Sequence, residues 1–378
     1  MNITECIHSF IIPYHSNREL LYLNLKLLKE TLPEKIKKEI IIVANNKDKS
    51  ELELGLSESE YTIIKVNDDI LYANAVNLGV NACHGDIVTL CDEDLFYLPH
   101  WYEPLFEKLN SDSGIGAVSS KLLNPSDNTI QDFGVAFSPY NINHPTLGLP
   151  MDHAYASFDR KVQSVCSAIL MTTKEVFQTV GGMDVSMSYL CCDCDYVIKL
   201  KEIGLETWVV ADSKVYHKGN TSFRNTKISR YSYLASDARS MFYGKNYYKI
   251  EIDMGDWIQK VGEIYKLNNE VLDKYTLINL SSFFSSEWYY TTIKKALNIE
   301  YYDIYSFNPY ERWIKQLQLY DFIPLGFLKH TAPIIYFVDQ IKSLRDNKIW
   351  NHLRDTSKDI AVDFHGNILS LKEIQKLY

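Results

Sequence analysis

The sequence predicts an α/β fold built on a mostly parallel sheet. Strand-like apolar segments alternate with helical segments over the first two-thirds of the chain, polar residues follow several of these segments, and the strand at 86–91 ends in three acidic residues. Alternation of this kind favours parallel strands covered by helices. The carboxyl ends of parallel strands meet at one edge, which is where ligands bind in open α/β sheets.

The first elements follow from local patterns. The short apolar run at 8–13 stops at Pro13, the leucines of 18–32 recur at helical spacing, and Asn45-Asn46 breaks the apolar strand before it. We therefore expect strands at 8–13, 39–44, 61–66 and 86–91, and helices at 18–32 and 72–83.

The middle of the chain is less regular. A loop at 138–153 contains three prolines and could be a mobile lid or an acceptor loop. Gly181-Gly182 ends one predicted helix. The expected elements are strands at 115–120, 162–173 and 206–210, and helices at 174–180 and 193–203.

Composition changes near 245–255, and we expect domains at 1–250 and 251–378. The second domain is predicted to be mostly α-helical, with amphipathic helices such as 257–275 and 310–320. It could bind the acceptor, mediate a homodimer or contact a membrane peripherally. Burial within the domain is the simpler explanation for the apolar segments 322–329 and 333–338.

Composition also excludes some functions. The chain has 378 residues, a net charge of −9 and no dense basic run, which argues against nucleic acid as the main partner. An odd count of seven cysteines favours a reducing cytosol. No signal peptide is expected, and no run of about 18 apolar residues suggests a membrane span.

The acidic residues Asp92, Glu93 and Asp94 carry the strongest chemical signal. Clustered carboxylates repel one another, and their oxygens suit hard cations such as Mg²⁺ or Mn²⁺, which in turn hold phosphates. A nucleotide-sugar diphosphate is one such ligand. Glu93 points to the opposite side of an extended segment, so we expect only its two neighbours to contact the ion.

An ordered set of motifs over residues 8–245 resembles glycosyltransferase family 2, and within it the bacterial rhamnosyltransferase-like branch. The resemblance implies inverting enzymes with a GT-A fold. The motifs are FIIPYH at 10–15, IIVANN at 41–46, ANAVNLG at 73–79, HGDIVTLCDED at 84–94, GAVSSKLLNP at 116–125, GGMD at 181–184, CDCDYVIKLKEIG at 192–204 and VYHKG at 215–219.

The resemblance implies a donor site and a metal site. Asp92, Asp94 and His217 would hold Mn²⁺ or Mg²⁺ on the donor diphosphate. A lone histidine is more often a packing residue, and zinc is disfavoured because Cys191-Cys192 does not match zinc-site spacing. The residues assigned to the donor are Pro13, Tyr14, His15, Asn45, Asn77 and Asp92.

The resemblance also implies that Asp193 is the general base that activates an acceptor hydroxyl. An acid at a helix start has a plainer explanation, since it caps free N–H groups. The family has Glu where this chain has Cys192, and commonly has Asp where it has Ala44. Acceptor contacts are assigned to Gly182, Asp184 and Asp195.

These implications predict a cytoplasmic glycosyltransferase, peripheral at the inner face of the membrane, in cell-surface polysaccharide synthesis. Its partners would be a UDP-, dTDP- or GDP-linked sugar and a glycan or lipid-linked acceptor. Lys218, Arg224 and Lys227 could neutralise the leaving diphosphate. Two alternatives stay open: a nucleotidyltransferase, disfavoured because 13–20 lacks glycine, and an inactive sugar-binding relative.

Overall fold

The computed structural model divides into two compact units, which we describe separately. The first comprises Met1–Val135 and Thr146–Glu251, and the second comprises Ala136–Pro145 and Ile252–Tyr378. The predicted domains 1–250 and 251–378 stay a prediction. The structure describes residues 2–15, 17–45, 61–66, 70–137, 142–187, 190–219, 228–251, 253, 275–279, 301–306, 334–338, 359–363 and 368–370.

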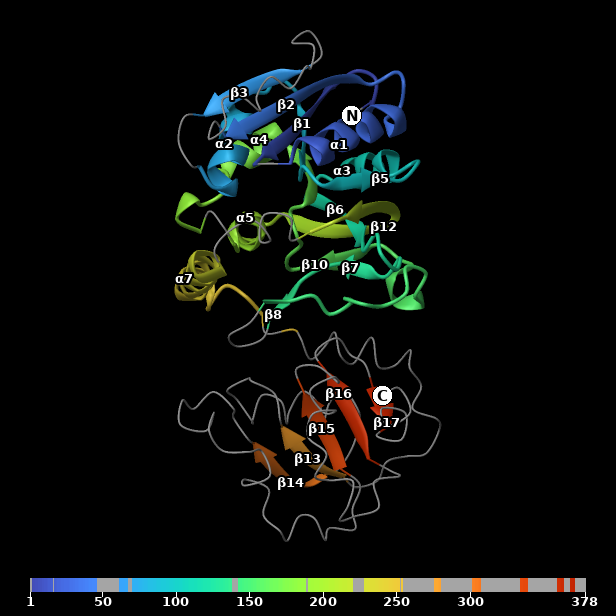
Figure 1. Cartoon of the computed structure of the whole chain (residues 1–378), viewed down its shortest axis with the longest axis vertical. Coiled ribbons are helices and arrows are strands. Elements are labelled where there is room, and N and C mark those ends of the chain that lie inside the picture. Colours follow the sequence, from blue (N-terminus) through green and yellow to red (C-terminus); the bar gives the residue numbers. More distant parts are fainter. Residues whose placement is uncertain are drawn as a thin grey trace. The chain divides into compact units, whose positions relative to one another are not determined.

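A ten-stranded sheet forms the core of the first unit (Figure 1). Its main path has the order β10-β12-β6-β11-β4-β1-β2-β3, while β5 pairs with β12 and β7 pairs with β6. The strands are β1 (Ile7–Tyr14), β2 (Lys37–Asn45), β3 (Thr62–Val66), β4 (Ile87–Cys91), β5 (Leu95–Tyr97), β6 (Ile115–Leu123), β7 (Ile130–Asp132), β10 (Arg160–Val162), β11 (Ile169–Thr173) and β12 (Glu206–His217).

Strand directions bring the candidate residues to one edge of this sheet. β3, β2, β1 and β4 are parallel neighbours, and β6 is parallel to β12. Because β11 is antiparallel to both β4 and β6, all six of these strands point the same way. Their ends define the carboxyl edge, which is marked by Tyr14, Asn45, Cys91, Leu123 and His217.

Helices pack against this sheet because their apolar residues recur on one face. In α1, Leu21, Leu25 and Leu28 are buried, and the Asn17 side chain caps the helix by accepting the Leu20 N–H. The helices are α1 (Arg18–Thr31), α2 (Tyr72–Ala82), α3 (Tyr102–Ser111), α4 (Lys174–Thr179), α5 (Cys192–Glu202) and α7 (Ile228–Asn246), with 3₁₀ turns η1 (Ala154–Ala156) and η2 (Val185–Met187). Among the described residues, no helix combines the length and apolar character needed to cross a membrane.

The sequence predicted these elements with a few informative differences. The segment 162–173 is not one strand, because residues 163–168 leave the ladder between β10 and β11. β12 runs on to His217 after a register irregularity between Val210 and Lys214, so the histidine ends a strand that is longer than the predicted 206–210. Neither β5 nor α3 was predicted.

The second unit contains a five-stranded sheet with the order β14-β13-β15-β16-β17. Its pairs are parallel except β16 with β17. The strands are β13 (Tyr275–Asn279), β14 (Tyr301–Ser306), β15 (Ile334–Val338), β16 (Ile360–Asp363) and β17 (Ile368–Ser370), while β8 (Ala136–Phe137) pairs antiparallel with β9 (Ile142–Asn143). A mostly helical second domain was expected, and this sheet was not. Most of the predicted helix 257–275 lies outside the described residues, as do the predicted helix 310–320 and the apolar segment 322–329.

Candidate functional site

Two acidic residues and a histidine meet at the carboxyl edge. Asp92 and Asp94 follow β4, and the antiparallel pairing of β5 with β12 sets Leu95 opposite His217. Nε2 of His217 therefore lies 3.2 Å from Oδ1 of Asp94 and 3.6 Å from Oδ2 of Asp92. One ligand atom from each side chain falls within 4.8 Å of the others, a spacing that could hold a metal ion.

Electrostatics within this acidic–histidine group favour a bound cation. Desolvation raises the pKa of Asp92 to about 6, against the influence of His217, and the negative charges of Asp94 and Asp193 raise it further. Burial alone would lower the pKa of His217, but the two carboxylates outweigh it and the pKa is raised. A divalent cation would relieve this repulsion between carboxylates.

The donor set fits such a cation. Oδ1 of Asp92 is buried and has no hydrogen-bond partner among the described residues, so an acceptor is left available beside His217. Two carboxylates and one neutral imidazole are ligands that suit Mn²⁺, and the carboxylates suit Mg²⁺. The acidic–histidine group can therefore hold a divalent metal.

Two long-range contacts that sequence reasoning missed fix the backbone around Asp92. The buried side chain of Asn24 donates to the Asp92 carbonyl at 2.9 Å, which ties α1 to the end of β4. Glu93 is not a member of the acidic–histidine group found among the described residues. Its buried carboxylate accepts the His15 N–H at 2.8 Å and so anchors the segment after β1.

The predicted donor residues lie along the same edge. Pro13 and Tyr14 are the last residues of β1, with Tyr14 buried, and exposed His15 follows them. Asn45 ends β2 opposite Val66 of β3. The backbone N–H of Lys218 donates to the Asp94 carbonyl at 3.2 Å. Arg224 and Lys227, like Asn46, lie outside the described residues.

Asp193 lies at the start of α5, close enough to raise the pKa of Asp92 through its charge. Its Oδ1 accepts the Cys194 N–H at 2.8 Å, as a helix-capping acid does, and its Oδ2 accepts the Ser167 N–H at 3.2 Å. The predicted base is thus held by its own helix and by the segment before β11.

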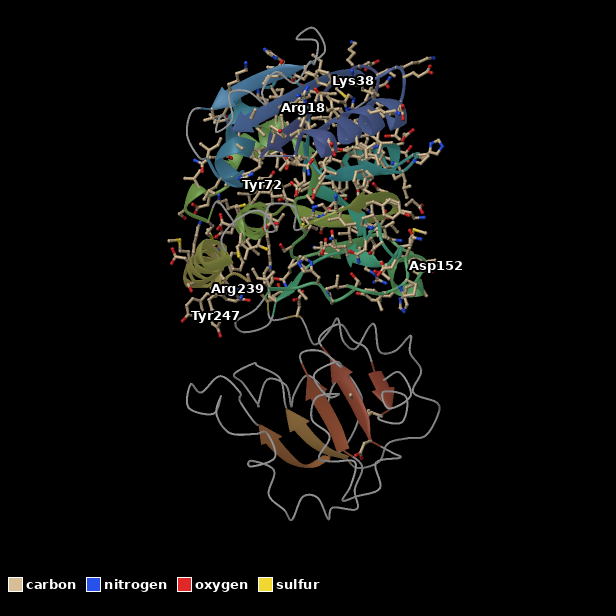
Figure 2. All side chains as sticks on the ribbon, in the orientation of Figure 1. Arg18, Lys38, Tyr72, Asp152, Arg239 and Tyr247 are labelled. Carbon is tan, nitrogen blue, oxygen red and sulfur yellow. The ribbon has the colours of Figure 1, made fainter. Side chains whose placement is uncertain are left out.

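A short polar bridge spans the two acidic positions. The Asp92 N–H donates to the carbonyl of Ala168, the residue next to Ser167. Tyr72, which Figure 2 labels near the start of α2, donates its hydroxyl to the Ser167 carbonyl at 3.0 Å and accepts from the Ser167 hydroxyl at 3.2 Å. Residues 167–168 therefore contact both Asp92 and Asp193.

Asn77 positions the GGMD turn. Its amide donates to the Met183 carbonyl at 2.8 Å and accepts the Met183 N–H at 2.9 Å. Gly182 adopts a φ of +66°, and a Cβ there would lie 2.7 Å from Asn77 Oδ1. Asn77 therefore holds the GGMD turn through two hydrogen bonds with the Met183 backbone. Its contact with the donor stays a prediction.

Two of the predicted acceptor residues are engaged by protein partners. Asp195 has no exposed surface and pairs with Lys199 at 3.2 Å and Lys245 at 2.8 Å, so it forms a brace between α5 and α7, and its acceptor role stays a prediction. The carboxylate of Asp184 pairs with the Lys245 ammonium at 2.7 Å and accepts the Ser186 N–H at 2.9 Å. The acceptor roles of Asp184 and Gly182 stay predictions.

All seven cysteines carry free thiols. Burial raises the pKa of Cys191 to about 12 and that of Cys192 well above its ordinary value. Within the described part of the chain, the metal-binding group found contains no cysteine. Cys191 and Cys192 are both buried and therefore pack in the interior.

Comparison with known proteins finds a matching family model and curated relatives. Residues 9–147 match the sequence model of "Glycosyl transferase family 2". The chain is 25% identical over 210 residues to the O-antigen biosynthesis protein RfbC of Myxococcus xanthus, covering 53% of this chain and 16% of that protein. It is 27% identical over 158 residues to the uncharacterized protein y4gI of Sinorhizobium fredii, covering 40% and 17%.

A structure of GalNAc-T7 with UDP, GalNAc and Mn²⁺ aligns with a TM-score of 0.49 at 15% identity, over 66% of this chain and 53% of that one. The chain spans about one-sixth of the length of the curated relatives it matches. From the family match and the sheet topology we conclude that the chain contains a family 2 glycosyltransferase domain with the GT-A fold, as predicted.

Proposed function

We propose that this chain is an inverting, metal-dependent glycosyltransferase. It moves a sugar from a nucleoside-diphosphate donor to a hydroxyl group of a glycan or lipid-linked acceptor. The observation that carries the proposal is the acidic–histidine group at the carboxyl edge of a family 2 domain, with Asp193 nearby. The cofactor is Mn²⁺ or Mg²⁺, held by Asp92, Asp94 and His217.

The chain's own residues account for the remaining steps. Asp193 accepts the proton of the acceptor hydroxyl as its oxygen attacks the anomeric carbon, and direct displacement inverts the configuration. The N–H groups of Ser167 and Cys194 fix the orientation of this carboxylate. When bound, the cation would stabilise the negative charge that builds on the leaving diphosphate.

We further propose that the product belongs to a cell-surface polysaccharide and is made on the cytoplasmic side, with peripheral contact at the membrane. The similarity to an O-antigen biosynthesis protein supports this acceptor class. The donor is a UDP-, dTDP- or GDP-linked sugar.

A donor screen in the presence of Mn²⁺ tests the proposal. We expect free nucleoside diphosphate and a sugar of inverted configuration, measured by mass spectrometry and proton NMR. Release of pyrophosphate would instead identify a nucleotidyltransferase. Calorimetry that detects donor binding without turnover of any donor and acceptor pair would identify an inactive relative.

A further inference from the structure

Gln131, which no sequence motif singled out, makes two contacts with His217. Its Oε1 lies 2.6 Å from Nδ1 of His217, and its Nε2 donates to the His217 carbonyl at 3.4 Å. The side-chain amide thus contacts both the ring and the backbone of one residue. The opposite ring nitrogen, Nε2, faces Asp92 and Asp94.

A β-bulge places Gln131 in this position. Between two successive pairs β6 advances by one residue, from Leu122 to Leu123, while β7 moves by two, from Asp132 to Ile130. Gln131 is therefore the additional residue, and bulges commonly redirect a side chain beside a functional site. Leu123 also pairs with Tyr216, so the bulge lies next to the end of β12.

The turn after His217 encloses the same amide. Gly219 has a φ of +59°, and a Cβ on it would lie 2.9 Å from Nε2 of Gln131 and 3.7 Å from Cε1 of His217. The backbone conformation therefore favours glycine, and a side chain here would displace the amide of Gln131.

These contacts determine which ring nitrogen carries the proton. A backbone carbonyl only accepts, so the NH₂ of Gln131 must face the His217 carbonyl, and its Oε1 is left to accept from Nδ1–H. In a neutral imidazole with the proton on Nδ1, Nε2 is an unprotonated acceptor. We propose that Gln131 is a positioning residue that holds His217 in this tautomer and aims Nε2 at the metal. The inference rests on the proposed metal centre.

Binding of Mn²⁺ alone tests the inference. The protein is titrated with Mn²⁺, and electron paramagnetic resonance measures the Mn²⁺ that remains free. We expect Gln131→Met to weaken Mn²⁺ binding roughly 10–100-fold, the range typical of residues that orient a metal-bound histidine. Gln131→Glu keeps an acceptor for the Nδ1 proton, so it should stay within roughly threefold of wild type. In a His217→Ala background, Gln131→Met should have no further effect.

Gln163 offers a matched control. Its amide forms two hydrogen bonds, of 2.8 and 3.0 Å, with the backbone of Glu251 rather than with a histidine. Gln163→Met should leave Mn²⁺ affinity unchanged. Nitrogen NMR of the histidine rings in the Mg²⁺-loaded protein should show Nδ1–H at His217 in wild type and a shift towards Nε2–H in Gln131→Met.

The outcomes separate the two ideas. If Gln131→Met binds Mn²⁺ as tightly as wild type while His217→Ala binds weakly, the positioning role is wrong and the metal centre stands. If Asp94→Asn and His217→Ala both bind Mn²⁺ like wild type, the metal centre is wrong, and the inference fails with it. If Gln131→Met lowered Mn²⁺ affinity equally in the wild-type and His217→Ala backgrounds, Gln131 would not act through the histidine.

Discussion

At the scale of single residues, the proposed mechanism depends most on Asp193. Both of its carboxylate oxygens accept backbone N–H groups, from Ser167 and Cys194, so its orientation is set before any acceptor arrives. An asparagine can occupy the same space and keep one of these contacts, but it cannot take a proton from a hydroxyl.

We therefore expect Asp193→Asn to lower the rate of nucleoside diphosphate release by roughly 10²–10⁴-fold. Mn²⁺ affinity should stay close to that of wild type, because Asp193 is outside the acidic–histidine group. The matched control is Asp112→Asn, an exposed aspartate whose side chain accepts the Gly114 N–H. Wild-type turnover in Asp193→Asn would exclude it as the base.

Asp184 should influence stability in a pH-dependent way. Burial alone would raise its pKa, but hydrogen bonds from Lys245 and Ser186 outweigh it, and the pKa lies well below the ordinary value of 3.8. A depressed pKa adds stability that is fully present above the unfolded-state pKa and is lost as the pH falls towards the folded-state pKa.

Asp184→Asn should accordingly lower the free energy of unfolding by about 1 kcal/mol at pH 7, since Lys245 is partly exposed. The difference from wild type should shrink once the pH falls below the ordinary aspartate value of 3.8. Urea unfolding at a series of pH values measures it, and a difference that grows on acidification would contradict the assignment.

At the scale of elements, a buried polar brace fixes α5 relative to α7. Asp195 pairs with Lys199 and Lys245 and also accepts from the buried amide of Asn246 at 2.9 Å. Lys199 in turn donates to the Gly182 carbonyl at 2.9 Å. The brace thus links α5, α7 and the GGMD turn.

Removing the Asp195 carboxylate deprives the ammonium groups of Lys199 and Lys245 of a shared negative partner. Asp195→Ala should lower the free energy of unfolding by about 2–3 kcal/mol, below the value for fully buried pairs because both lysines keep exposed surface. Glu30→Ala, which breaks the exposed pair with Lys26, should cost under about 0.5 kcal/mol. If both variants lost the same free energy of unfolding in urea, the buried brace would be no more stabilising than an exposed ion pair.

At the scale of the whole molecule, sequence patterns predicted the local elements and the residues carried by motifs. Asp92 and Asp94 were recognised because they follow an apolar strand, and parallel strands gather such ends at one edge. His217 and Asp193 were identified through motifs that resemble the family. These signals are local, so a single sequence displays them.

Residues that act through long-range contacts were not predictable in this way. Gln131 contacts a residue 86 positions away, and Asn24 contacts one 68 positions away. Neither lies in a recognisable motif, and hydrophobic periodicity carries no information on such pairings. The pairing of Asp195 was not foreseen for the same reason, because its partners Lys245 and Asn246 come from a distant helix.

The account as a whole depends on a divalent ion held by Asp92, Asp94 and His217 against a diphosphate. Electron–nuclear double resonance of the Mn²⁺-loaded protein with UDP or GDP measures this arrangement directly. We predict phosphorus couplings from the diphosphate together with a nitrogen coupling that disappears in His217→Ala. A spectrum identical to that of Mn²⁺ and nucleotide in buffer, unchanged in Asp94→Asn, would contradict it.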